Sequence, residues 1–240
     1  MTILSYVDKS KWLEAASYVA TQTLRGDRVP VIDGIDYTPL WWTNKYPQIR
    51  IFWEPRISTK TIDLVIESIA DLAFQIGHDF IPEFDFITLG SHDSAMQQIQ
   101  NACVGGKLDN KRLANIVASE PYRNEANGGE QHGDVYITTR EFVDDSASWG
   151  AAGFQHGILM LTLYGNRQQS RDFLKKVVIH EAGHFFGLPL HCDDSVVDEY
   201  GYDQNCVMHY QCPSSMLCPK CQDWIRQWWV QSRGVITGQV

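Results

Sequence analysis

Apolar residues recur at helical spacing in several long stretches of the chain. Within residues 60–77 a single apolar stripe begins at Ile62, runs to Ala73 and is followed by Gly77. Comparable patterns predict three further helices, at residues 9–25, 171–187 and 219–232. The stripe on each stretch indicates that one face of the helix packs against other elements.

Shorter runs of β-branched and aromatic residues predict the strands. These runs are residues 49–53, 85–89, 134–139 and 158–164. The polar, glycine-containing stretches 119–133 and 142–156 are interpreted as long surface loops. Strands that alternate with helices predict an α/β (α+β) fold, in which helices pack on a mixed, twisted sheet.

The composition supports one folded domain with a distinct C-terminal part. The 240 residues are 44% hydrophobic and 20% charged, which is typical of a folded chain and argues against disorder. After Gly187 the regular pattern stops, and cysteine and aspartate become frequent. We therefore expect residues 1–187 to form an N-terminal (upper) subdomain and residues 188–240 a smaller, irregular C-terminal (lower) one.

Charge and targeting signals narrow the range of partners. The 29 acidic residues outnumber the 20 basic ones, and the net charge of -9 argues against a nucleic-acid partner. The N-terminal segment contains no basic leader followed by an apolar run, and the apolar stretch 157–164 is far too short to cross a bilayer. We expect a cytoplasmic protein without a membrane partner, whose cysteines are thiols or metal ligands rather than disulfides.

Potential metal ligands are concentrated in one part of the chain. Five of the six cysteines and four of the eight histidines lie between residues 180 and 221. His180 and His184 are four residues apart in the predicted helix 171–187, so both imidazoles lie on one face, at a spacing that can chelate one Zn²⁺. Glu181 lies beside them, where its carboxylate can hold a metal-bound water. Apolar neighbours bury this part of the helix, and burial without a metal would be unfavourable.

The motif resembles that of the metzincin peptidases, HExxHxxGxxH followed later by a Met-turn. The match covers residues 180–187, after which the spacing differs. The metzincin pattern expects a third histidine ligand at position 190, which is Leu190 here, and His191 follows one residue later. We expect His191 to be the third zinc ligand, with Asp194 and His209 as the alternatives.

The cysteines extend the resemblance to the archaemetzincins. In that family a cysteine after the third histidine, a C-x-M and a C-x-x-C together hold a structural zinc ion. Matched by position, these ligands are Cys192, Cys206, Cys218 and Cys221. The gap from Cys192 to Cys206 is longer than in the family, and the gap from Met208 to Cys218 is shorter. Cys212 is a fifth cysteine that could replace one of the four.

The resemblance implies a zinc metallopeptidase, a hydrolase of peptide or protein substrates with one catalytic and one structural zinc ion. A zinc-bound water, activated by Glu181, would attack the scissile carbonyl. Met208 would form the Met-turn, an apolar floor beneath the histidines. Tyr210 would reach the metal or the oxyanion, or pack at the turn, and the strand at 158–164 would border the cleft and pair with extended substrate.

Two alternatives remain open. The cysteines could form the ribbon of a non-catalytic zinc-binding interaction module, which would bind about one zinc ion per chain, whereas the peptidase would bind about two. An acidic third ligand such as Glu199 would instead indicate a zinc peptidase of another clan. The sequence leaves the oligomeric state open.

Overall fold

The computed structural model describes the central part of the chain and portions of the C-terminal part. The described residues are 31–32, 35–36, 48–77, 84–118, 132–143, 149–153, 157–164, 170–188, 192, 205–209, 212 and 214–226. The helix predicted at 9–25 lies outside them.

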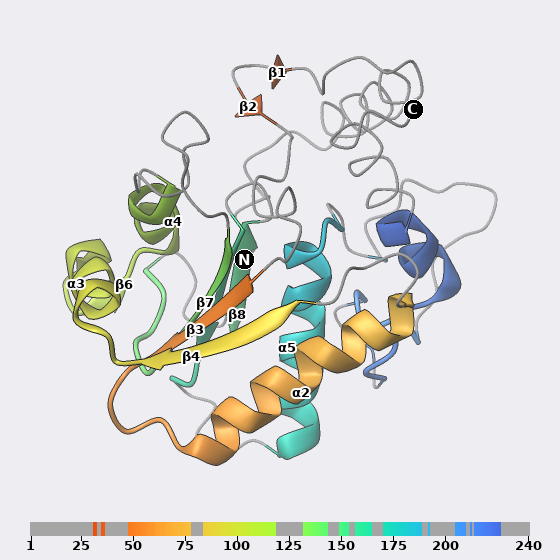
Figure 1. Ribbon diagram of the computed structural model, residues 1–240, viewed down its shortest axis with the longest axis horizontal. Helices are drawn as coiled ribbons and strands as arrows, with labels where there is room; N and C mark the ends of the chain where they lie inside the picture. The colour runs from red at the N-terminus through yellow and green to blue at the C-terminus, as the bar shows by residue number, and fades with distance from the viewer. Residues whose placement is uncertain are drawn as a thin grey trace.

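Five strands form one mixed sheet at the centre of the molecule (Figure 1). In spatial order they are β4 (Asp85–Gly90), β3 (Gln48–Trp53), β7 (His132–Thr138), β9 (Ile158–Thr162) and β8 (Gly150–Gly153). The first four are mutually parallel, and β8 pairs with β9 in the antiparallel direction. Strands β7 and β9 are buried along their whole length, as expected for strands covered by helices on both faces.

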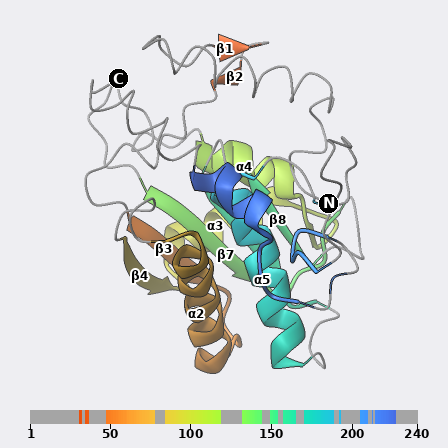
Figure 2. The ribbon, with the colours of Figure 1, turned by 90° about the vertical axis from the view of Figure 1, so that its right-hand side faces the viewer.

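Helices cover both faces of this sheet. On one face lie α2 (Thr59–Ile76) and α5 (Arg171–Phe185), and on the other lie α3 (Asp93–Ala102) and α4 (Asn110–Ala118) (Figures 1 and 2). Alternate residues of β7 face the two layers: Val135 and Ile137 belong to the core beside α2 and α5, whereas Tyr136 packs with α3 and α4. The predicted α/β fold, a mixed sheet with packed helices, is confirmed.

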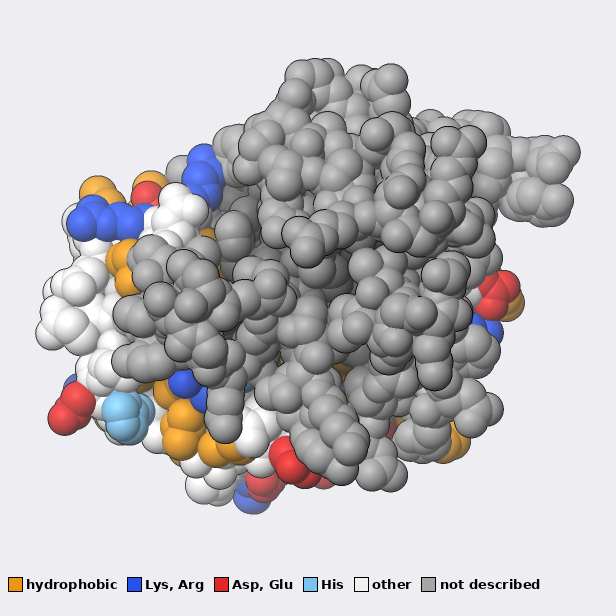
Figure 3. Space-filling view, turned by 45° about the horizontal axis from the view of Figure 1, so that its top comes forward, with side chains coloured by type: hydrophobic (Ala, Val, Ile, Leu, Met, Phe, Trp, Pro, Cys, Tyr) orange, Lys and Arg blue, Asp and Glu red, His pale blue; other side chains and the backbone are white. Residues whose placement is uncertain are grey.

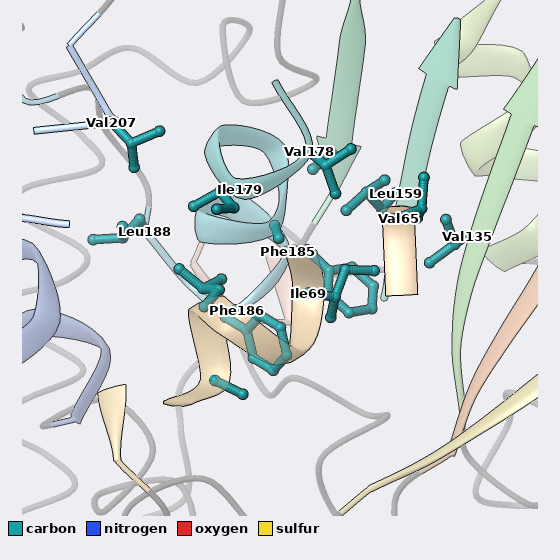
Figure 4. Close-up of a cluster of buried hydrophobic side chains, with 14 of the residues drawn as sticks. Val65, Ile69, Val135, Leu159, Val178, Ile179, Phe185, Phe186, Leu188 and Val207 are labelled. Atoms are coloured by element: carbon teal, nitrogen blue, oxygen red, sulfur yellow. The ribbon is translucent and has the colours of Figure 1, made fainter. Parts of the chain in front are cut away.

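The larger hydrophobic core lies between the sheet and the pair of helices α2 and α5. Figure 4 shows Val65 of α2 beside Phe185 of α5 and Leu159 of β9, and all three side chains are fully buried. Ion pairs link the more exposed sides of the two helices, Arg171 with Glu67 and Lys175 with Asp71. Helix α5, which carries the HExxH motif, is therefore held by the sheet on one side and by α2 on another.

Most predicted elements are confirmed, with ends that shift by a few residues. The predicted helices 60–77 and 171–187 are α2 and α5, and the four predicted strands are β3, β4, β7 and β9. Of the helix predicted at 219–232, the described residues 219–226 are helical. Two short antiparallel pairs were not predicted, β1 (Val31–Ile32) with β2 (Ile35–Asp36), and β5 (Cys103–Val104) with β6 (Lys107–Leu108).

Two predictions about the polar stretches need correction. The stretch 142–156 is not wholly a loop, because it contains β8, and the stretch 119–133 ends inside β7. Strand β8 has the sequence GAAG, which lacks the β-branched and aromatic residues that signal a strand. Helices α3 and α4 were also not predicted, because they are short and alanines supply much of their buried face.

The described surface is mixed in character. Figure 3 shows hydrophobic, basic and acidic side chains of the described residues close together around the rim of one face. Large hydrophobic side chains that reach solvent include Phe74 on α2 and Met216. No described helix is both long enough and apolar enough to span a bilayer.

Candidate active site and cysteine cluster

Helix α5 has a defined cap at each end. Ser170 is the N-cap, and its hydroxyl accepts a hydrogen bond from the backbone N–H of Phe173 at 3.2 Å. At the other end Gly187 has a φ of 108°, and its N–H donates to the carbonyl of His184 at 3.0 Å. The next N–H in the chain donates to the carbonyl of Gly183, also at 3.0 Å. These two bonds form a Schellman motif, which stops the helix directly after the second histidine.

His180 and His184 are both oriented through their Nδ1 atoms. The Nδ1 of His180 lies 2.8 Å from the carbonyl oxygen of Val207, and the Nδ1 of His184 lies 2.7 Å from that of Leu188. A carbonyl oxygen only accepts, so each Nδ1 carries a hydrogen, and in the neutral ring each Nε2 then holds the lone pair. That tautomer is the one in which an imidazole binds a metal through Nε2. The two rings lie with their centroids 5.2 Å apart on one side of α5.

Glu181 is buried between α5 and the first residue of β8. Only 8% of the residue is exposed, and its Oε2 has no hydrogen-bond partner among the described residues. A methyl group on Gly150 would lie 2.3 Å from the Cγ of Glu181, so the two residues are in close contact. Burial raises the pKa of this carboxyl group to about 7. A buried carboxylate oxygen without a partner, beside two oriented imidazoles, fits a site that holds a cation and a water molecule.

Met208 packs against the face of α5 that carries the histidines. Its side chain is fully buried, and a methyl group on Gly183 would lie 2.7 Å from its sulfur. The carbonyl of Met208 accepts a hydrogen bond from the N–H of Cys192 at 3.1 Å. The glycine between the two histidines is therefore the residue that allows Met208 to approach the helix, in agreement with the position expected for a Met-turn.

Four cysteine sulfurs gather beside this turn. The sulfurs of Cys192, Cys206, Cys218 and Cys221, here called the cysteine cluster, all lie within 4.8 Å of one another. The Sγ–Sγ distances are 3.9 Å between Cys192 and Cys218 and 3.7 Å between Cys206 and Cys221. A disulfide requires about 2.05 Å, whereas four sulfurs about 2.3 Å from a tetrahedral zinc ion are separated by about 3.8 Å. The cysteine cluster thus fits a zinc ion and not a pair of disulfides.

The cysteines of the cluster influence one another's ionisation. Hydrogen bonds from neighbouring thiols, first from Cys206, lower the pKa of Cys218. Hydrogen bonds to neighbouring sulfurs, first to Cys192, raise the pKa of Cys221. Among the protein groups alone, one thiolate is stabilised at the expense of the others, and a bound cation would allow several thiolates to coexist.

Cys212, the fifth cysteine of this region, lies outside the cluster. It is buried, and its sulfur accepts a hydrogen bond from the N–H of Ser214 at 3.1 Å. The structure therefore brings together the four cysteines that the family resemblance selected, with Cys212 as the additional one.

Several predicted site residues lie outside the described residues. These are His191, Asp194, Glu199 and Tyr210. His209 is described: it is partly buried, and its N–H donates to the carbonyl of Cys206 at 2.9 Å. The identity of the third ligand at the histidine pair stays a prediction.

The structure corrects the role expected of the strand at 158–164. This strand, β9, is paired on both sides, with β7 and with β8, so it has no open edge that could pair with a substrate. Among the described strands β8 is the outermost on this side of the sheet, and it also carries Gly150, which contacts Glu181. Pattern analysis missed β8 because small residues, which allow this close packing, also remove the usual strand signal.

Comparison with known proteins finds relatives at the level of structure. No protein-family model and no curated protein matches the sequence. The fold is similar to that of archaemetzincin from Methanopyrus kandleri, at 15% sequence identity and a TM-score of 0.52, over 76% of this chain and 94% of that chain. This likeness confirms the fold that the motifs implied.

Two further solved structures are similar. A zinc-dependent peptidase from Methanocorpusculum labreanum matches at 16% identity and a TM-score of 0.48, over 74% of this chain and 99% of that chain. Archaemetzincin from Archaeoglobus fulgidus matches at 14% identity and a TM-score of 0.48, over 73% of this chain and 98% of that chain.

Proposed function

We propose that this protein is a zinc-dependent peptidase. The observation that carries the proposal is the arrangement at the end of α5, where the buried Glu181 carboxylate lies beside two histidines that are both held in the metal-binding tautomer. An archaemetzincin has the same fold, which supports the proposal. In a non-catalytic zinc module the Glu181 carboxyl group would have no role, although its burial costs free energy.

The zinc site is proposed to consist of three histidines. His180 and His184 would bind through Nε2, and His191, close after the helix, would supply the third nitrogen. When bound, zinc supplies a Lewis acid that polarises the scissile carbonyl and acidifies water. The protein holds the two described imidazoles in place with backbone carbonyls, which lowers the cost of orienting them when the metal binds.

Glu181 is proposed to move the proton. Its carboxylate would accept a proton from the attacking water and then deliver it to the leaving amine. Contact with Gly150 on β8 restricts the positions that the carboxylate can take. Tyr210 is proposed to donate a hydrogen bond to the oxyanion that develops on the carbonyl oxygen.

Strand β8 is proposed to receive the substrate. It is the last described strand on its side of the sheet, so an extended peptide could add to it through main-chain hydrogen bonds. Gly150 of β8 contacts Glu181, so a peptide paired there would pass close to the proton acceptor. This placement favours peptide or protein substrates over small molecules.

The cysteine cluster is proposed to hold a second, structural zinc ion. Its sulfur separations match the tetrahedral geometry of a four-thiolate site. Structural sites of this kind contribute directly to the stability of irregular segments. The ligands come from Cys192, from the turn at 205–209 and from the segment 217–221, so one ion would join three pieces of chain.

The test is the variant Glu181→Gln, which keeps the size of the side chain and removes the carboxylate. Zinc-loaded wild-type protein should cleave members of a diverse peptide library, and the variant should lose cleavage by at least about 100-fold. Zinc content, measured by mass spectrometry, should be equal in both proteins. Cleavage that survives in Glu181→Gln would overturn the assignment of Glu181, and a metal-loaded wild type without any cleavage would favour a non-catalytic zinc module.

A further inference from the structure

The turn at 205–209 belongs to both of the metal sites proposed above. Cys206 contributes a sulfur to the cysteine cluster. The carbonyl of the next residue, Val207, lies 2.8 Å from the Nδ1 of His180, and Met208 packs on Gly183 of α5. Of three consecutive residues, Cys206 is thus part of the cluster, Val207 bonds a proposed zinc ligand, and Met208 packs beneath the histidine pair.

The two histidines depend on different parts of the chain for their orientation. The carbonyl bonded to His184 is that of Leu188, which is fixed by the Schellman motif at the end of the same helix. The carbonyl bonded to His180 lies far along the chain, in a turn that has no regular secondary structure. A change in the cysteine cluster is therefore expected to alter the orientation of His180 but not that of His184.

Hydrogen bonds hold the turn internally and to neighbouring segments: the N–H of His209 donates to the carbonyl of Cys206 at 2.9 Å, and the N–H of Cys212 donates to the carbonyl of His209 at 3.1 Å. The N–H of Val207 donates to the carbonyl of Met216 at 2.7 Å, and the N–H of Cys192 donates to the carbonyl of Met208 at 3.1 Å. The sulfur of Cys206 also accepts the N–H of Cys218 at 3.3 Å. The bonds from Cys192 and Cys218 join the turn to cysteines of the cluster, so closing the cluster around an ion would also hold the turn.

We propose that the cysteine cluster positions His180: binding of a metal in the cluster holds the carbonyl of Val207 in place and thereby raises the metal affinity of the histidine pair. The inference rests on the proposed function in that it takes His180 to be a metal ligand, but it does not require catalysis. Coupling of this kind is reciprocal, so a metal bound at the histidine pair also raises the affinity of the cysteine cluster for its own metal ion. Residues that orient a metal-binding histidine typically change metal affinity by about 10- to 100-fold when they are lost.

The first experiment compares Cys218→Ser, which removes a ligand of the cluster, with Cys212→Ser, which changes a buried cysteine outside it. Long-range ¹H–¹⁵N spectra of the histidine side chains report the tautomer of each ring. We expect His180 to lose its pure Nδ1–H tautomer in Cys218→Ser, while His184 keeps it. The zinc affinity of the histidine pair, measured by chelator competition, should fall about tenfold or more in Cys218→Ser and remain unchanged in Cys212→Ser.

The second experiment needs no substitution and covers the case in which Cys218→Ser fails to fold. Wild-type protein, stripped of metal, receives one equivalent of ¹¹³Cd²⁺, a soft ion that prefers thiolates. The cadmium chemical shift shows when the four-sulfur site is filled, and the histidine spectra are recorded before and after. Ordering of the His180 tautomer on filling of the cluster supports the proposal. A His180 ring that does not respond, or that responds together with His184, overturns it.

The outcomes separate this inference from the proposed function. A protein that shows the His180 response but cleaves no peptide would retain the coupling and lose the peptidase assignment. A protein that cleaves peptides through Glu181 but shows no His180 response would retain the peptidase assignment and lose the coupling.

Discussion

The position of the Glu181 carboxylate depends on a residue that has no side chain. Gly150 lies so close that a methyl group there would sit 2.3 Å from the Cγ of Glu181, well inside the usual carbon–carbon contact distance of about 3.5–4.0 Å. The HExxH motif identifies Glu181 from the sequence. The contact with Gly150 is invisible there, because it joins two elements that only the fold brings together.

Substitution of Gly150 by alanine should therefore displace the proton acceptor. For Gly150→Ala we expect kcat to fall about 100-fold, because displacements of about 1 Å have effects of this size. The free energy of unfolding should fall by about 2 kcal/mol through overpacking. Zinc content serves as the control and should be unchanged, since neither His180 nor His184 is touched. Peptide cleavage at the wild-type rate would contradict the proposed contact.

A second buried glutamate, at the end of β3, has a structural role. The carboxylate of Glu54 accepts hydrogen bonds from the hydroxyl of Thr138 at 2.8 Å, from the N–H of Thr139 at 2.8 Å and from the Nε of Arg140 at 2.6 Å. Burial alone would raise the pKa of Glu54, but the hydrogen bonds and the charge of Arg140 outweigh burial and lower it. The ionised form is therefore favoured in the folded protein.

The stability contributed by Glu54 should depend on pH. Because its pKa is lower in the folded state, the contribution is fully present above the ordinary glutamate pKa of about 4.3 and is lost as the pH falls through the folded-state value. At pH 7 we expect Glu54→Gln to lower the free energy of unfolding by roughly 2 kcal/mol. Urea unfolding should show that the difference in stability between the wild type and Glu54→Gln becomes smaller as the pH falls below about 4.3, the ordinary pKa of glutamate. The matched control Glu67→Gln, at an exposed ion pair, should have little effect at either pH.

Helix α5 does more than present the HExxH residues at the right spacing. Its C-terminal Schellman motif places the carbonyl of Leu188 at the Nδ1 of His184, so the end of the helix also orients a proposed ligand. The motif requires a residue with positive φ, which Gly187 provides at 108°. The helix, its end and one histidine thus form a single local unit.

Replacing this glycine should affect the site as well as stability. Gly187→Ala forces a residue with a side chain into positive φ, at a cost of about 1 kcal/mol, and should displace the Leu188 carbonyl. Gly106→Ala is the matched control, because Gly106 has a φ of 84° in a hairpin turn, where an added methyl group would have no atom within 4 Å. Both variants should lose similar stability on urea unfolding, but only Gly187→Ala should bind zinc more weakly at the histidine pair. Equal zinc binding in the two would contradict this role.

Elements with a clear pattern of large apolar residues were predictable, and those built largely from small residues were not. Helix α2 buries Ile62, Val65, Ile69 and Leu72 at regular spacing, and that stripe identifies it in the sequence. Helices α3 and α4 are short and mix alanine with a few larger apolar residues on the sides that pack, and strand β8 consists of alanine and glycine. Such residues carry little hydrophobic signal, although the structure needs their small size.

In the molecule as a whole, residues 215–226 of the C-terminal part pack against the end of α2. Arg226 donates from its Nε to the carbonyl of Ile76 at 2.7 Å, where a positive charge complements the helix dipole. The side chain of Gln75 bonds the carbonyl of Ser215 at 3.2 Å and the N–H of Leu217 at 2.8 Å. These contacts connect residues near the cysteine cluster with the helix that supports α5. The division into subdomains 1–187 and 188–240 stays a prediction.

Metal counting tests the organisation of the whole molecule. We expect about two zinc ions per wild-type chain, one at the histidine pair and one in the cysteine cluster. Mass spectrometry of His180→Ala should then give about one. Chelation of both ions should lower the midpoint of thermal unfolding, because a ligand that binds only the folded state stabilises it. A wild type with about one zinc ion, lost in Cys218→Ser and retained in His180→Ala, would indicate a zinc ribbon and no histidine site.

The local chemistry of the site could be predicted from the sequence. His180, Glu181 and His184 lie on one helix at fixed spacing, and the regular pattern stops after Gly187, because each of these features depends on neighbours a few residues away. The four cysteines were chosen by family resemblance, and the close approach of their sulfurs came from the fold. Tertiary packing also set the partners of Glu181 and His180, the edge position of β8 and the exclusion of Cys212. Those contacts join residues that are distant in the chain. A local sequence pattern does not indicate which distant residue supplies a backbone carbonyl or leaves space for a carboxylate.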